Sequence, residues 1–196
     1  MPRLSAHVPA RADFIAPMKA LGVTTVPSGL WRCEIKFDGY RAVALLNRGK
    51  AELWSRNRKE MSADYPEITA ALGKVNCRSA VLDGEVVALD AAGRSRFQLL
   101  QGRDTGEERP LLLFYIFDVM AVDGESLMAL PIESRRQRLE KLLPKPARPL
   151  LLSPVFEVEP AALMREAQKQ FLAGIIAKRP GSVYEADRRS DRKSVV

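Results

Sequence analysis

The chain of 196 residues contains a single histidine, His7, and only two cysteines, Cys33 and Cys77, which lie far apart. Neither their number nor their spacing fits a zinc site or a dithiol redox motif, so we expect reduced thiols. No apolar run approaches the ~18 residues of a membrane-spanning helix. The N-terminus also lacks the apolar centre of a secretory signal. The sequence therefore predicts a cytoplasmic protein with no membrane partner.

The composition is that of a globular domain with an excess of basic residues. Hydrophobic residues make up 46% of the chain and charged residues 28%, which is enough for one domain with a core. The formal net charge of +7 favours a polyanionic partner such as nucleic acid. Residues 1–12 contain prolines and arginines but no acidic residue, and we expect a flexible leader there.

Short strands and a few helices alternate along the chain. Apolar and β-branched runs predict strands at 31–37, 40–46, 51–55, 80–89, 111–120, 150–158 and 174–178. Apolar spacing and first-turn prolines predict helices at 65–72, 97–101, 132–143 and 161–171. The helix at 132–143 carries a basic face and is expected on the surface. This pattern favours an α+β fold over a doubly wound sheet.

The most informative segment is residues 34–42, which reads E-I-K-F-D-G-Y-R-A after an apolar, strand-like run. A lysine becomes nucleophilic when burial or nearby cations favour its neutral amine. Continued strand alternation would put Lys36, Asp38 and Tyr40 on one face. Gly39 would let a phosphate or ribose approach the backbone, and Arg41 could hold one of its oxygens. The alternative is an exposed lysine before a D-G hairpin turn.

Four further motifs follow in order. Residues 55–57 read S-R-N at a strand end, where Arg56 could bind a phosphate or lie in a solvent-exposed turn. The D-G-E at 83–85 lies among buried strand residues, so its carboxylates need partners or ligands unless it forms a hairpin turn. Phe117, in an aromatic strand, could belong to the core or stack on a base. Residues 173–178 read A-G-I-I-A-K and end in Lys178, which could neutralise a phosphate.

In this order and spacing, the motifs resemble those of ATP-dependent DNA ligases. The phrases at 60–67 and 95–101 resemble the adenylation domain of bacterial end-joining DNA ligases in particular. The resemblance implies an ATP-grasp-like nucleotidyltransferase domain over residues 13–190, with two antiparallel sheets, flanking helices and ATP between the sheets. It also implies a role in DNA repair and recombination, with nicked or broken double-stranded DNA as the partner.

The resemblance assigns a role to each matching residue. Lys36 and Lys178 would be catalytic: Lys36 would attack the α-phosphorus of ATP to form lysyl-AMP, and Lys178 would neutralise the α-phosphate. AMP would then pass to a DNA 5′-phosphate, and a 3′-hydroxyl would displace it to seal the nick. Glu34 would lie beside the adenine edge, while Phe117 would stack on the adenine.

The remaining matches bind the sugar, the DNA or a metal. Arg41 and Glu85 would hold the ribose, and Arg56 would reach the 5′-phosphate of the nick. Asp38 and Glu85 would support the Mg²⁺ or Mn²⁺ that accompanies ATP.

The chain departs from the family pattern at two places. Ala173 replaces a glutamate that takes part in metal binding. Residues 191–196 stand in place of the last motif, W-x-K-x-K, so we expect a truncated tail without the OB-fold domain that closes over ATP. A separate closing domain or end-joining proteins would then be partners. Two alternatives stay open: a degenerate remnant that binds ATP or DNA without ligation, and RNA ligation or capping-type transfer.

Overall fold

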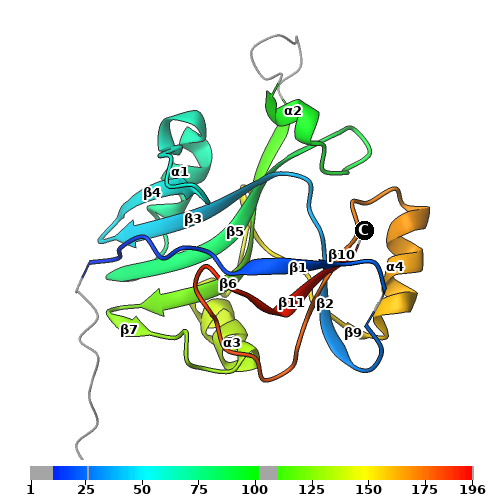
Figure 1. The fold of residues 1–196 in the computed structure, drawn as a ribbon. Helices are drawn as coiled ribbons and strands as arrows, with labels where there is room; N and C mark the ends of the chain where they lie inside the picture. Colours follow the sequence, from blue (N-terminus) through cyan, green and yellow to red (C-terminus); the bar gives the residue numbers. More distant parts are fainter. Residues whose placement is uncertain (1–10, 26, 102–109, 196) are drawn as a thin grey trace, which may run out of the picture.

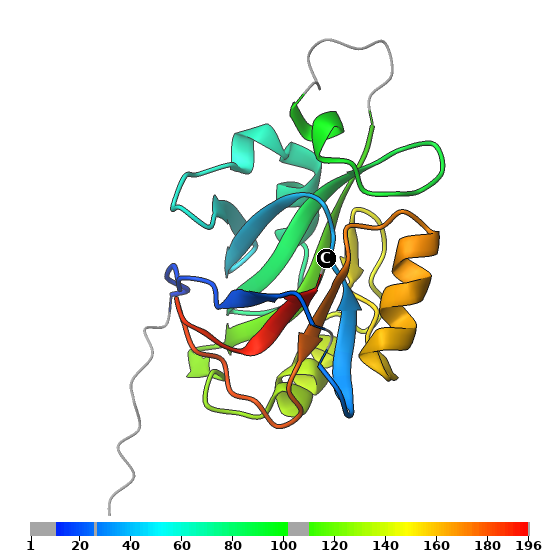
Figure 2. The same ribbon diagram turned by 45° about the vertical axis from the view of Figure 1, so that its right-hand side comes forward.

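The computed structural model describes residues 11–25, 27–101 and 110–195. These residues form two β-sheets that face each other, with helices on their outer sides (Figures 1 and 2). The larger sheet has the order β4-β3-β5-β6-β7, and β8 pairs in parallel with β6. Its strands are β3 (Tyr40–Asn47), β4 (Lys50–Ser55), β5 (Ser79–Leu89), β6 (Leu111–Val122), β7 (Glu125–Ser126) and β8 (Leu150–Leu152).

The smaller sheet joins the two ends of the chain. Its order is β1-β11-β10-β2-β9, and the terminal strands β1 and β11 run in parallel. The strands are β1 (Lys19–Val23), β2 (Trp31–Ile35), β9 (Phe156–Val158), β10 (Ile175–Lys178) and β11 (Arg189–Val195). Figure 2 shows β1 and β11 lying side by side in front of the larger sheet.

Helices cover the outer face of each sheet. The short 3₁₀ helix η1 (Ser62–Asp64) and the helices α1 (Pro66–Leu72), α2 (Phe97–Gln101) and α3 (Ile132–Leu142) lie by the larger sheet, and α4 (Pro160–Lys169) packs against the smaller one. Two-residue alternation sorts each strand between an outer core and the space between the sheets. In β10, Ile175 and Ala177 pack among the residues that contact α4, whereas Lys178 points inward to Phe117.

The structure confirms the α+β class and most of the expected elements, with differences at three places. Residues 150–158 form not one strand but two, β8 and β9, in different sheets; Pro154 lies between them and has no N–H for a ladder. Both sheets contain a parallel pair and are therefore mixed. The strands β1, β7 and β11 are not predicted from the sequence.

The third difference concerns the expected tail. Residues 191–195 form most of β11, which pairs with β10 on one side and β1 on the other, so the boundary placed at residue 190 falls inside a strand. None of the described helices is long and apolar enough to cross a membrane.

Candidate functional site

A β-bulge in β6 defines the centre of the site. Asp83 pairs with Asp118 while Gly84 pairs with Ile116, so Phe117 has no partner in the ladder. A bulge of this kind bends the strand and changes the direction of a side chain. The ring of Phe117 is buried, with 6% of its surface exposed, and contacts cations from both sheets.

Three cations surround the Phe117 ring. The Arg41 guanidinium carbon from β3 lies 4.5 Å from the ring centroid, that of Arg192 from β11 lies 4.8 Å away, and the Lys178 Nζ from β10 lies 5.0 Å away. Each distance is within the range of a cation–π interaction. The structure therefore brings together three sequence-predicted residues, Arg41, Phe117 and Lys178, and adds Arg192.

Lys178 is held by a buried ion pair. Its Nζ donates to Oε1 of Glu34, and the Ser153 hydroxyl donates to the other Glu34 oxygen at 2.9 Å. Burial lowers the pKa of Lys178, although the charge of Glu34 opposes this. Glu34 was expected beside an adenine edge; in this structure both of its oxygens accept bonds from protein groups.

Arg41 is fixed by the aspartate of the D-G-E motif. Its Nε and Nη2 donate to the two oxygens of Asp83 at 2.5 and 2.6 Å, a bidentate arrangement. The Tyr184 hydroxyl donates to the same carboxylate at 2.7 Å and accepts from the Met18 N–H at 2.9 Å. Burial, with the nearby charge of Asp83, raises the pKa of Tyr184 well above its usual value. This network joins the residue before β1, strands β3 and β5, and the segment before β11.

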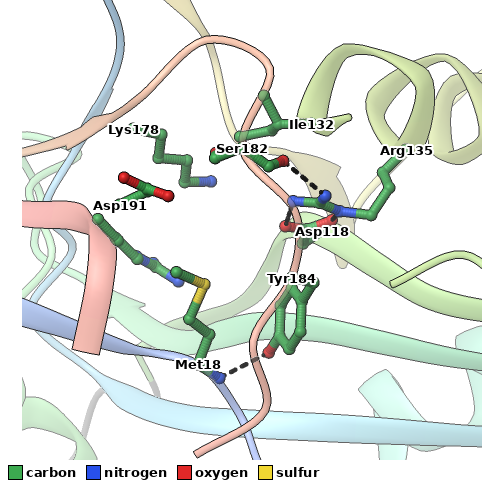
Figure 3. Close-up of a pocket in the computed structure, with 9 residues that line it drawn as sticks. Met18, Asp118, Ile132, Arg135, Lys178, Ser182, Tyr184 and Asp191 are labelled. Atoms are coloured by element: carbon green, nitrogen blue, oxygen red, sulfur yellow. Dashed lines mark hydrogen bonds and ion pairs between the residues drawn. The ribbon is translucent and has the colours of Figure 1, made fainter. Parts of the chain in front are cut away.

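A second buried pair supports the other side of the site (Figure 3). Asp118, which follows Phe117, accepts two bonds from Arg135 of α3 at 2.8 and 3.0 Å. Arg135 also donates to the carbonyl oxygens of Leu130 at 2.6 Å and Ser182 at 3.0 Å. The expected surface helix therefore buries one of its arginines, and that arginine anchors the segment between β10 and β11.

These buried groups line a small cavity between the sheets. It has a volume of about 10 Å³, room for roughly one water molecule. Figure 3 shows Lys178, Asp118 and Tyr184 around it, and Arg192 also contributes to the wall.

Lys36 lies where the chain leaves the smaller sheet. β2 ends at Ile35, and the Lys36 N–H donates to the Gly174 carbonyl at 3.0 Å. The expected strand alternation therefore fails after Ile35, because Tyr40 already belongs to β3 of the other sheet and packs against Phe97. Lys36 is partly exposed, and its charge acts on Glu85 across this crossing.

Asp38 and Gly39 fix the crossing itself. The Asp38 carboxylate accepts from the Phe97 N–H at 3.1 Å, at the first residue of α2, and the Asp38 N–H donates to Ser95 Oγ at 3.1 Å. A Cβ on Gly39 would collide with the carbonyl oxygen of Val86 in β5. The close approach at Gly39 is thus to the neighbouring strand, whereas the sequence analysis expected a ligand there.

Among the described carboxylates of the site, Glu85 is open to a ligand. It lies opposite Arg41 in the β3–β5 register, is partly exposed, and makes no hydrogen bond within the described part of the chain. Burial raises its pKa to about 7, against the opposing charges of Arg41 and Arg192. Arg56 is exposed at the end of β4, where its N–H donates to the Arg41 carbonyl at 3.3 Å, outside the central cluster.

The residues around the site have few metal-ligating groups. No cluster of three or more His, Cys, Asp or Glu side chains within residues 11–25, 27–101 and 110–195 could hold a metal ion. Asp83 and Asp118 are each paired with an arginine. Of the two expected metal ligands, Asp38 has one oxygen bonded to the Phe97 N–H, and Glu85 keeps its carboxylate open.

A comparison with family models identifies this arrangement. The model described as ATP dependent DNA ligase domain matches residues 15–193. The chain belongs to the ATP-dependent DNA ligase family. This confirms the resemblance inferred from the motifs, the nucleotidyltransferase fold and the enzyme class.

Two similar ligases among known proteins are named as end-joining proteins. LigD of Pseudomonas aeruginosa, a multifunctional non-homologous end joining protein, is 36% identical over 180 residues, which is 91% of this chain and 21% of that protein. LigD of Mycobacterium tuberculosis is 34% identical over 181 residues, or 90% of this chain and 23% of that protein. The ligase domain thus spans less than a quarter of either relative.

A solved structure shows the same architecture. Mycobacterial DNA ligase D complexed with ATP and MES superposes with a TM-score of 0.81 at 30% identity, covering 92% of this chain and 60% of that one. The ligase domain of M. tuberculosis LigD gives 0.79 at 31% identity, with coverages of 92% and 60%.

The sequence analysis missed most of the residues that organise the site. The sequence predicts only that the carboxylates of the D-G-E motif, Asp83 among them, need partners or ligands, and it does not single out Asp118. Arg135 and Tyr184 lie outside the five motifs, and only their burial reveals them, at 1% and 4% exposure. Arg192 was placed in the tail. An arginine in a helix with other basic residues gives no signal in the sequence that it will be buried.

Proposed function

We propose that this ligase domain transfers AMP from ATP to its own Lys36 and then to a DNA 5′-phosphate. The Lys36 nitrogen would attack the α-phosphorus, the bond from that phosphorus to the β-phosphate oxygen would break, and pyrophosphate would leave. The lysine loses a proton in this step. One observation carries the proposal: Lys36 lies at the crossing between the two sheets, within electrostatic reach of Glu85.

The nucleotide would lie between the sheets, with its adenine on Phe117. For the base to stack there, one or more of the cations now over the ring must move away from it. The released positive charge would then face the phosphates, where it stabilises the charge that develops at the α-phosphate. Lys178 suits this role because it is already desolvated and held in place by Glu34.

A divalent ion would be held mainly by the nucleotide. Mg²⁺ usually takes one or two carboxylates together with phosphate oxygens and water. Glu85 and the second Asp38 oxygen supply such donors, so the described residues fit Mg²⁺ or Mn²⁺ bound in this manner. When bound, the ion would offset phosphate charge. Because Ala173 has no carboxylate, fewer protein oxygens would be available to coordinate the ion.

The second and third steps need DNA. The net charge of +7 and the exposed Arg56 at the rim of the site suit nicked or broken double-stranded DNA, with Arg56 at the 5′-phosphate. A 3′-hydroxyl would then displace AMP and seal the nick. Because the relatives are end-joining proteins several times longer, we further propose a role in DNA repair and recombination, with a separate closing domain or end-joining proteins as partners.

Labelling with α-³²P-ATP and Mg²⁺ tests the first step. The unaltered chain should form a labelled protein adduct, and Lys36→Ala should form none. Lys50→Ala is the matched control, because Lys50 is exposed at the first residue of β4 and should label as the parent does. Equal label on the parent and on Lys36→Ala would reject Lys36 as the nucleophile.

The same assay separates the alternatives. Folded parent protein that binds ATP but takes no label would support the degenerate remnant. Adenylated protein that seals nicked RNA duplexes and leaves nicked DNA unsealed would overturn the choice of DNA as the substrate.

A further inference from the structure

Arg192 occupies a place that the ligase motifs do not explain. It lies in β11 directly opposite Lys178 of β10, and only 6% of it is exposed. Its guanidinium carbon is 4.8 Å from the centroid of Phe117, so its side chain extends into the space between the sheets. Arg192 reaches this central position because β11 lies inside the smaller sheet, between β1 and β10.

The Arg192 guanidinium forms no hydrogen bond or ion pair with the residues that the structure describes. Its Nε is buried and has no hydrogen-bond partner among the described residues. Of the carboxylates that interact with its charge, Asp83 accepts from Arg41 and Tyr184, and Glu34 accepts from Lys178 and Ser153. The third, Glu85, forms no hydrogen bond or ion pair with Arg192 in the described part of the chain. Arg192 therefore stands as a surplus cation in the cluster.

Such a residue destabilises the free protein. A buried charge is costly unless it is paired and hydrogen-bonded, and Arg192 also lies near two other cations, Arg41 and Lys178. Burial, with the charge of Arg41, lowers the pKa of Arg192. The contact with the Phe117 ring offsets only part of this cost. An anion bound between the sheets would supply the missing partner.

We propose that Arg192 binds the α-phosphate of the nucleotide, as an additional phosphate-binding residue of this ligase domain. The inference rests on the proposed function. The planar guanidinium can donate two parallel hydrogen bonds to phosphate oxygens, which suits this anion better than a single-point cation. The α-phosphate follows the ribose directly and is therefore the phosphate nearest to a base stacked on Phe117. Lys178, opposite in the ladder, would meet the same group.

The test measures binding without covalent chemistry. In a Lys36→Ala parent, the affinities for adenosine, AMP and ATP are determined by calorimetry, with and without Arg192→Met. The arginine variant should bind AMP and ATP about 10- to 100-fold more weakly and adenosine within about twofold of the parent, because only the phosphate contact is removed. Arg192→Lys should recover part of the loss.

Lys193→Met is the matched control. Lys193 is the next residue of β11 and pairs with Ala177, whose side chain packs on the α4 side, so alternation places Lys193 away from the site. Its substitution should leave all three affinities unchanged. The melting temperature of the ligand-free protein provides an independent readout: Arg192→Met should keep or raise it, because a surplus buried charge is removed.

Each other outcome overturns the inference. Equal losses for adenosine, AMP and ATP would make Arg192 a structural support of the base site. A loss confined to ATP would move its contact to the β- or γ-phosphate. A lower melting temperature, or failure of Arg192→Met to fold, would show that the arginine serves the fold. Failure of the Lys36→Ala parent to bind ATP would instead reject the proposed function.

Discussion

Replacing Arg135 with methionine should strongly destabilise the domain. Arg135 is 1% exposed and Asp118 5% exposed, and they are joined by two hydrogen bonds of 2.8 and 3.0 Å. The same guanidinium also satisfies the carbonyls of Leu130 and Ser182. Methionine fills much of the volume but leaves a buried carboxylate without its cation and two carbonyl oxygens without donors.

The size of the effect follows from this arrangement. Removal of one partner of a buried ion pair costs about 3–5 kcal/mol, mostly because the remaining charge is uncompensated. A domain of this kind has a free energy of unfolding of roughly 5–15 kcal/mol, so the loss is a large share of the total. The double variant Asp118→Asn, Arg135→Met removes the isolated charge as well, and should recover about 1–3 kcal/mol relative to Arg135→Met.

Urea unfolding followed by circular dichroism measures these differences in the free energy of unfolding. The comparison requires that the free energy falls with urea concentration at the same slope in each variant. Arg138→Met is the control on the same helix, because Arg138 is exposed and its contact with Glu125 spans 3.5 Å. An exposed pair of this kind is worth about 0–1 kcal/mol. If Arg135→Met lay within about 1 kcal/mol of the unaltered chain, the reasoning on the buried pair would be refuted.

Two further predictions concern the D-G-E motif. A Cβ at Gly84 would lie 2.5 Å from Cε2 of Phe114, so Gly84→Ala should cost about 1–3 kcal/mol in urea unfolding. Gly22→Ala, which meets no atom within 4 Å, should cost less than Gly84→Ala; equal losses would contradict the packing argument. The pKa of Glu85 is raised from 4.5 to about 7, so between these values the folded chain holds a proton that the unfolded chain has released. Stability should therefore fall as pH rises through this window, and Glu85→Gln should flatten the fall in melting temperature; an unchanged pH profile would refute this.

Much of the fold could be predicted from sequence because its long strands carry their own pattern. β3 contains the apolar run 42–46, and β5 has apolar runs at 80–82 and 86–89 on the two sides of the D-G-E motif. The residues of these runs alternate between the outer core and the space between the sheets. The short strands were less predictable. β11 reads R-S-D-R-K-S-V and has little apolar content, so its strand character comes from pairing with β10 and with β1, about 170 residues earlier in the chain. Local propensity carries no record of such distant partners.

The candidate site also contains both residues that the sequence predicts and residues whose position depends on the pairing of strands. Arg41, Phe117 and Lys178 could be predicted because each lies in a motif whose residue types suit phosphate or base binding, and the structure brings them to one place. The expected position of Tyr40 failed because alternation was extended past Ile35, where the chain changes sheets. A periodic rule holds only within one element, and the end of β2 is set by the pairing of the strand, not by its sequence.

Charge pairing explains why the sequence could not distinguish structural from ligand-binding arginines. Arg41, Arg135 and Arg192 have the same chemistry in the sequence, and all three are largely buried. Two of them form a bidentate pair with an aspartate of β5 or β6, whereas Arg192 contacts an aromatic ring and forms no ion pair with the described residues. This difference arises from three-dimensional pairing, because the aspartates for Arg41 and Arg135 stand 42 and 17 residues away. The arginine left without an acid is therefore the one whose charge is available to a phosphate.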